Sequence, residues 1–190
     1  MRTSLVDSNI KNMIDKKVLV SSLPIKDYVQ PASLDIPIGS SAYMLKITFL
    51  PCNNGVSNII DTLKINEQDL SDGGMLYKGC TYIIPTEVYV DLPADVEGKL
   101  SPKSSIGRVD LLVRSVVDKV GLYDTIPPLK RSRIYVEVTP NFNVIVYSGD
   151  TLNQLMLFKG NTSHSLKNEN IIYDSEGNSL LNSLYSEDKI

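Results

Sequence analysis

Short apolar segments, most of them rich in β-branched and aromatic residues, dominate the first 160 positions of the chain. This pattern predicts strands over residues 42–50, 80–84, 88–92, 111–117, 134–139, 143–147 and 152–158. Turn-forming residues separate these segments at 72–74, 92–95, 139–141 and 148–150. Many short strands with regular turns are typical of an antiparallel sandwich or barrel such as a jelly roll.

Two segments show helical spacing instead. Near the start, Ile10, Met13 and Ile14 share one helical face. Asp7 or Ser8 is expected to cap this helix, and Lys16 and Lys17 to end it. A second short helix is predicted over residues 56–65, where Ile59, Ile60 and Leu63 share a face. The predicted fold is therefore mainly β with a short N-terminal helix.

The chain changes character after about residue 160. The last 30 residues are rich in Asn, Ser, Glu and Asp and contain only scattered Leu and Ile. We therefore predict one domain over residues 1–160, followed by a polar C-terminal tail or linker over 161–190.

The composition and the charge of the chain limit the kinds of partner that it is expected to bind. A 190-residue chain with 42% hydrophobic residues can bury a proper core. Its net charge of −3 gives no global basic field, so nucleic acid is not expected as a partner, while a local cationic pocket for one phosphorylated ligand is compatible with it. No secretory signal and no apolar run of about 20 residues is present, which predicts a cytoplasmic protein that does not span a membrane.

Several catalytic classes are disfavoured by the residues that the chain lacks. The one histidine, His164, lies in the polar tail, and the chain has no Pro-Cys-x-x-Cys pair. A zinc deaminase or a Ser-His-Asp hydrolase is therefore not expected. Neither a P-loop nor a GxGxxG turn is present. An enzyme with this sequence would work with carboxylates, hydroxyls, backbone groups and water.

Residues 98–108 are the most informative segment. Their second half combines two cations, Lys103 and Arg108, with the hydroxyls of Ser104 and Ser105 and a permissive Gly107. These are the parts of a loop that cradles phosphate. Composition alone favours the alternative, an ordinary polar turn between strands.

A second informative segment is the predicted strand that carries Glu137. Alternation along this strand turns Glu137 to the face opposite Val136 and Val138. In isolation, a solvated Glu on a half-exposed strand is the favoured interpretation. The functional alternative is a general base held in a pocket with a raised pKa.

Four segments in this order resemble the dUTPase and dCTP deaminase superfamily, namely residues 30–39 (QPASLDIPIG), 92–108, 135–137 and 149–155. A Glu at position 137, where dUTPases use an Asp after a Tyr, favours the deaminases. More narrowly, the chain resembles the N-terminal module of the long, two-module dCTP deaminases of alphaproteobacteria. The resemblance implies a distorted jelly roll of the dUTPase-like β-clip type.

The resemblance also implies an activity, the conversion of dCTP and water to dUTP and ammonia without zinc. Glu137 would activate the water, and Ser104 would help to orient that water or the amino group. Mg²⁺ would bridge the triphosphate, and dTTP is a further expected nucleotide. Pockets in this family are shared between the subunits of a homotrimer, or of a trimer of paired modules. The residues expected to bind substrate are Lys103, Ser105, Ile106, Gly107, Arg108, Val117, Lys119, Tyr135, Val136 and Gln154.

The chain departs from the family pattern at three places. Residues 129–132 replace a Gly-aromatic-x-Gly turn, and Lys119 stands where an Arg is usual. Tyr185 and Lys189 do not reproduce the spacing of the C-terminal lid. Two alternatives therefore stay open, a dUTP diphosphatase or bifunctional deaminase and diphosphatase, and a non-catalytic half-module that completes the pocket of a partner module.

Overall fold

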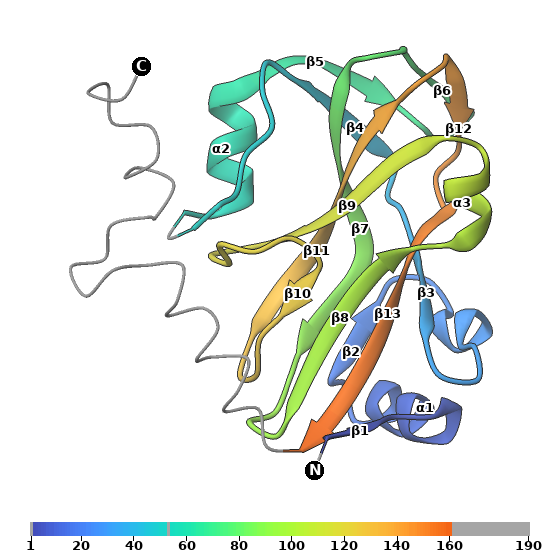
Figure 1. Ribbon diagram of the computed structural model, residues 1–190, viewed down its shortest axis with the longest axis vertical. Coiled ribbons are helices and arrows are strands. Elements are labelled where there is room, and N and C mark those ends of the chain that lie inside the picture. The colour runs from blue at the N-terminus through green and yellow to red at the C-terminus, as the bar shows by residue number, and fades with distance from the viewer. Residues whose placement is uncertain (1, 53, 161–190) are drawn as a thin grey trace, which may run out of the picture.

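Two antiparallel sheets form the body of the protein in the computed structural model, which describes residues 2–52 and 54–160 (Figure 1). The first sheet has the order β1 (Arg2–Ser4), β13 (Thr151–Gly160), β8 (Val96–Pro102), β10 (Thr125–Ile126), with β3 (Leu34–Pro37) also paired to β13. The second has the order β5 (Lys64–Asp69), β4 (Ser41–Leu45), β7 (Thr81–Asp91), β11 (Arg131–Pro140), β9 (Leu111–Val117), with β2 (Leu19–Ser21) paired to β7. A small third sheet pairs β6 (Gly74–Leu76) with β12 (Val144–Val146). The predicted mainly β fold class is confirmed.

The main core lies between the two large sheets. Ile134 of β11 and Leu155 of β13 are fully buried in one apolar cluster, although they belong to different sheets. Further along β11, Val136 and Val138 are buried in a second cluster. These three β11 residues alternate along the strand and therefore share its inner face.

The helices of the described residues are short: α1 (Asp7–Asp15), α2 (Val56–Leu63) and α3 (Ser104–Arg108), with a 3-10 turn at Ile25–Tyr28. The prediction that Asp7 or Ser8 caps the first helix is wrong. Val6 is the N-cap, and its backbone N–H donates to Oδ1 of Asn9 at 3.2 Å. Asp7 lies in the first turn instead, where it forms an ion pair with Lys11.

The helix α2 covers part of the outer face of the second sheet. Its Val56 and Ile60 are buried with Ile83, Val116 and Tyr135, which come from β7, β9 and β11. In Figure 1, α2 lies near one end of β9 and α3 at the other. The outer face of β11 is therefore covered by α2 around Tyr135, while Arg131 at the start of the strand is exposed.

Several predicted strand and helix boundaries are wrong, and two of the differences follow from strand pairing. The strands expected at 80–84 and 88–92 are one strand, β7, and the register with β11 shifts between Arg133 and Tyr135, opposite Pro85. Proline has no N–H to give to a ladder, so an irregularity at this point is expected. The predicted helix over 56–65 ends at Leu63, because Lys64 pairs with Leu45.

The segment 98–108, interpreted as a loop from its composition, is not a loop. Its first part belongs to β8, which is paired with β13 along its whole length, and Ser104–Arg108 form the single turn of α3. The tail predicted over 161–190 lies outside the described residues. Every helix among the residues that the structure describes is too short or too polar to cross a lipid bilayer.

Candidate active site

A buried carboxylate, Glu137, lies at the middle of β11 on the outer face of the second sheet. Its side chain is 2% exposed, and it does not reach solvent as an ordinary surface Glu does. Alternation places it opposite the core valines, as predicted. The interpretation as a solvated surface Glu is therefore wrong, whereas the role of Glu137 as a general base stays a prediction.

Two residues contact the carboxylate of Glu137. Arg114, its register partner on β9, donates from Nε at 3.1 Å and from Nη2 at 2.5 Å, both to Oε1. The other oxygen, Oε2, lies 3.5 Å from the hydroxyl of Tyr123. The Arg114 guanidinium also stacks on the Tyr123 ring, 4.1 Å from its centroid.

A second carboxylate, Asp124, lies close to this group. Its Oδ1 accepts the backbone N–H of Ser115 at 2.7 Å, and its own N–H donates to the Ser115 carbonyl at 3.0 Å. The Ser115 hydroxyl accepts a hydrogen bond from the fully buried amide of Asn153, on β13. Hydrogen bonds thus link Asn153 of the first sheet to Ser115 of β9, and Ser115 to Asp124.

Burial shifts the pKa of both carboxyl groups upward. For Glu137 the loss of hydration raises the pKa, and the hydrogen bond and charge of Arg114 oppose that rise. Burial also raises the pKa of Asp124, against its bonds to Ser115 and the charge of Arg114. A carboxylate whose pKa is moved toward neutrality is suited to accept a proton at neutral pH.

The predicted phosphate-binding residues lie on and beside α3. Ser104, Ser105, Gly107 and Arg108 are exposed. Within the described part of the chain, no hydrogen bond or ion pair joins them to Glu137. The structure therefore does not bring the two halves of the predicted site into contact within one chain.

The remaining predicted residues are placed in different ways. Lys103 Nζ donates to Asp35 Oδ2 at 2.5 Å and to Thr151 at 2.8 Å. Gln154 accepts from Ser33 and donates to Ser101, both at 3.2 Å. Ile106 packs partly buried beside the core cluster that contains Val136, and Lys119 is exposed with a positive φ of 56°.

Val117 and Val136 have fully buried side chains in the core. Any contact of these two residues with a ligand would therefore be made by their backbone groups.

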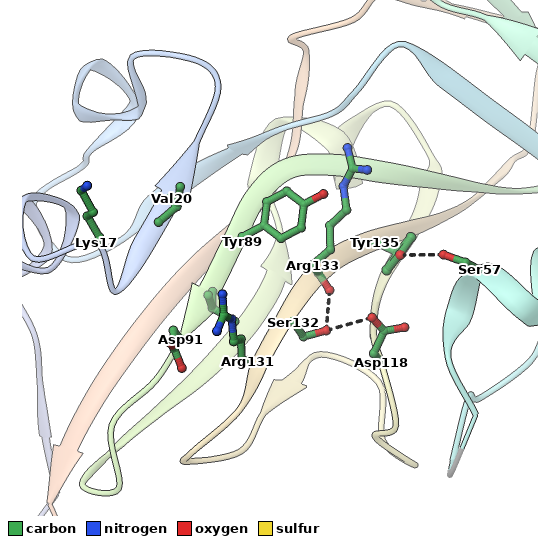
Figure 2. Close-up of a pocket in the computed structure, with 11 residues that line it drawn as sticks. Lys17, Val20, Ser57, Tyr89, Asp91, Asp118, Arg131, Ser132, Arg133 and Tyr135 are labelled. Atoms are coloured by element: carbon green, nitrogen blue, oxygen red, sulfur yellow. Dashed lines mark hydrogen bonds between the residues drawn. The ribbon is translucent and has the colours of Figure 1, made fainter.

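A cavity of about 530 Å³ opens beside Tyr135 on the same side of the sheet (Figure 2). Figure 2 shows Tyr135 and Ser57 directed toward one another, with their oxygens 3.4 Å apart. Asp118 accepts a hydrogen bond from Ser132 at 3.3 Å, and Arg133 lies 5.2 Å from the Tyr89 ring centroid. Tyr135 precedes Glu137 by two residues on the same face, about 7 Å along the strand.

The residues that surround Glu137 are not among those predicted from the sequence. Arg114 had a signal, since it is a lone cation in the apolar segment 111–117. Tyr123 and Asp124 had none, because they lie in a connection whose path depends on the tertiary fold.

The described residues contain no group of three or more His, Cys, Asp or Glu side chains placed to hold a metal ion. The cationic residues of the α3 segment, Lys103 and Arg108, suit phosphate oxygens and cannot coordinate a metal. Magnesium carried by the phosphates of a nucleotide would not need a protein ligand cluster.

Comparison with known proteins shows which proteins the chain is similar to. A protein of Nanoarchaeum equitans named "dCTP deaminase, dUMP-forming" is 24% identical over 173 residues, which are 83% of this chain and 84% of that protein. A dCTP deaminase of Aeromonas salmonicida is 25% identical over 125 residues, covering 61% of this chain and 65% of that protein.

Among solved structures, the 2'-deoxycytidine 5'-triphosphate deaminase of Agrobacterium tumefaciens superimposes with a TM-score of 0.80 at 35% identity. The match covers 87% of this chain and 52% of that chain, so this chain spans about half the length of that relative. The family model described as the 2'-deoxycytidine 5'-triphosphate deaminase (DCD) N-terminal domain matches residues 2–161. The resemblance drawn from the sequence is thus confirmed, and the chain belongs to the dCTP deaminase family.

Proposed function

We propose that this chain deaminates dCTP, converting dCTP and water to dUTP and ammonia, with Glu137 as the general base. The observation that carries the proposal is the carboxylate itself: it is 2% exposed, it has a raised pKa, and one of its oxygens, Oε2, is bonded only weakly. A group of this kind takes a proton from water more readily than a solvated carboxylate does.

The proposed chemistry needs only this one base. Glu137 takes a proton from water as the water oxygen bonds to C4 of the cytosine ring. The same proton then passes to the amino nitrogen, the C4–N bond breaks, and ammonia leaves. The second proton of the water passes from the C4 hydroxyl to N3 of the ring, which leaves a carbonyl at C4, so the product base is uracil. Ser104 would orient the water or the amino group.

The other predicted residues would hold the substrate. Lys103, Ser105 and Arg108 would bind the triphosphate, together with backbone groups of the α3 turn, and Gln154 would contact the base or the sugar. The exposure of Ser105 and Arg108 supports this assignment, because their donors are open to a ligand. Mg²⁺ would accompany the phosphates and neutralise part of their charge.

A homotrimer, or a trimer of paired modules, would bring the two halves of the site together. The support is the lack of contact between α3 and Glu137 within the described part of one chain. Mixing an Arg108→Ala protein with a Glu137→Gln protein tests this idea. Shared sites predict that activity partly returns after subunit exchange. A monomer in light scattering, or exchanged subunits that regain nothing, would exclude shared sites.

A bifunctional deaminase and diphosphatase is the second candidate. The observation in its favour is Asp124, a second carboxylate whose pKa burial raises and whose charge in turn raises the pKa of Glu137. Two coupled carboxylates can activate water for two different reactions.

Product analysis separates the candidates. The purified chain is incubated with Mg²⁺ and either dCTP or dUTP, and ammonia and pyrophosphate are measured separately. The proposal predicts ammonia and dUTP from dCTP and no pyrophosphate. Pyrophosphate together with ammonia would identify the bifunctional enzyme, and pyrophosphate from dUTP alone a diphosphatase. Neither product would identify a non-catalytic module.

A metal-removal experiment belongs to the same assay. Activity is expected to return in full when strong chelation is followed by magnesium alone. Stoichiometric, tightly bound zinc in the active protein would contradict a zinc-free mechanism.

A further inference from the structure

The side chain of Arg114 fixes one oxygen of Glu137 and leaves the other available. Both Nε and Nη2 of Arg114 donate to Oε1, at 3.1 and 2.5 Å. On the other oxygen, Oε2, the contact with the Tyr123 hydroxyl is at 3.5 Å, the weak limit of a hydrogen bond. A fork directed at a single oxygen sets the rotation of the carboxylate group. Oε2 is then the oxygen with capacity to accept a further proton.

Arg114 is itself held in place. Its guanidinium stacks on the Tyr123 ring at 4.1 Å from the centroid, and the Tyr123 hydroxyl donates to the Phe49 carbonyl at 3.3 Å. Stacking on an aromatic face is a favourable arrangement for Arg that Lys cannot reproduce in the same planar way. Tyr123, which lies outside both β9 and β11, therefore restrains Arg114, the charge partner of Glu137.

Arg114 also lowers the pKa of Glu137, through its positive charge. The Glu137 side chain is 2% exposed, whereas that of Arg114 is 34% exposed, so the cation keeps part of its hydration. The groups that act on Glu137 are Arg114 and Tyr123, which lower its pKa, and Asp124, which raises it. Arg114 is the only cation among them, and it opposes the loss of charge that burial favours.

We propose that Arg114 is the positioning residue of the deamination: it holds Oε1 of Glu137, so that Oε2 accepts the proton of the attacking water. The inference rests on the proposed function of Glu137. Arg114 touches no reacting atom and acts only through the carboxylate, in the manner of the third group that orients a catalytic base.

Two variants separate charge from geometry. Arg114→Lys keeps the positive charge but loses the fork and the planar stack, while Arg114→Gln loses the charge as well. In both variants kcat is expected to fall by about 10- to 100-fold with KM for dCTP nearly unchanged, because a misplaced base affects the chemical step. Lys78→Gln, which removes an exposed cation in the turn before β7, serves as the control and keeps the parental kcat.

The pH dependence gives a readout that a merely structural role does not move. In Arg114→Gln, the acidic limb of kcat/KM shifts to higher pH, because the pKa of Glu137 rises when its cation is lost. In Arg114→Lys, the limb stays close to its parental position. A carbon-13 NMR titration of glutamate-labelled protein measures the same shift without turnover, and the Glu137 signal is assigned by its loss in Glu137→Gln.

The outcomes are distinct from those of the proposed function. If folded Arg114→Gln titrates as the parent does, or if Arg114→Gln and Arg114→Lys both keep the parental kcat, Arg114 is not the positioning residue. This conclusion holds whatever Glu137→Gln shows. If Arg114→Gln does not fold, the kcat and KM of Arg114→Lys decide the matter alone. Parental turnover in Glu137→Gln would instead overturn the proposed function.

Discussion

Removal of the Asp118 side chain tests how α2 is fixed over the outer face of the second sheet. Asp118 Oδ1 accepts the backbone N–H of Val56, the first residue of α2, at 2.6 Å, and Oδ2 accepts the Ser132 hydroxyl at 3.3 Å. The first N–H groups of a helix have no partner within the helix, so Asp118 acts as a cap supplied from a distant part of the chain.

The expected loss of stability in Asp118→Ala follows from these two contacts. Loss of a helix cap costs about 0.5–2 kcal/mol. Loss of the long hydrogen bond from the Ser132 hydroxyl, which is shared with the Arg133 carbonyl, costs about 0.5–1 kcal/mol. For Asp118→Ala we therefore expect a loss of about 2 kcal/mol in the free energy of unfolding. For a chain of this size that loss corresponds to a fall of roughly 4–8 °C in Tm.

Thermal unfolding followed by circular dichroism measures the change, and hydrogen exchange locates it. Asp118→Asn keeps an acceptor oxygen and is expected to lose about half as much. Asp91→Ala removes the same charge from the lining of the same cavity and should leave Tm within about 1–2 °C of the parent, as surface substitutions do. Faster exchange of the α2 amides is expected in Asp118→Ala only. If Asp118→Ala unfolds at the same temperature as Asp91→Ala, the capping role is wrong.

Two further predictions concern stability. Lys103→Met leaves the Asp35 carboxylate, 11% exposed, without its 2.5 Å partner and is expected to cost about 1–3 kcal/mol in urea unfolding. Adding Asp35→Leu should recover part of that loss, and no recovery would exclude the pair as the cause. For Glu137, burial raises the folded-state pKa above the unfolded value near 4, so its contribution to stability is present below that pH and is lost as the pH rises through the folded pKa. Between pH 4 and pH 8, the free energy of unfolding of the parent should therefore fall relative to that of Glu137→Gln, as measured by urea unfolding. A difference that does not depend on pH would contradict the raised pKa.

The fold was predictable where pattern alone decides structure. β9 begins and ends at Leu111 and Val117 as predicted, because an apolar run between turns has one simple outcome. β8 was missed, since its Gly98, Lys99 and Ser101 have a loop composition and only pairing with β13 makes them a strand. The strand propensity of a few residues does not depend on a pairing strand that lies more than 50 residues away in the sequence, so it cannot predict the pairing.

The candidate site was predictable only in part, for a related reason. Glu137 stood out because its neighbours alternate with it along one strand. Its partners Arg114, Tyr123 and Asp124 come from β9 and from the connection after it, and nothing local assigns them to Glu137. The family resemblance did not supply them either, since it rests on the four segments 30–39, 92–108, 135–137 and 149–155.

Ammonia release from dCTP by the parent chain and by Glu137→Gln, side by side, tests the central claim most directly. Gln has nearly the same shape as Glu but cannot accept a proton at neutral pH, so the variant should keep its fold and its binding of dCTP. In Glu137→Gln, kcat for deamination is expected to fall by roughly 10²–10⁴ or more, with an unchanged circular dichroism spectrum and a similar Kd for dCTP. A Glu137→Gln protein that releases ammonia at close to the parental rate would contradict it.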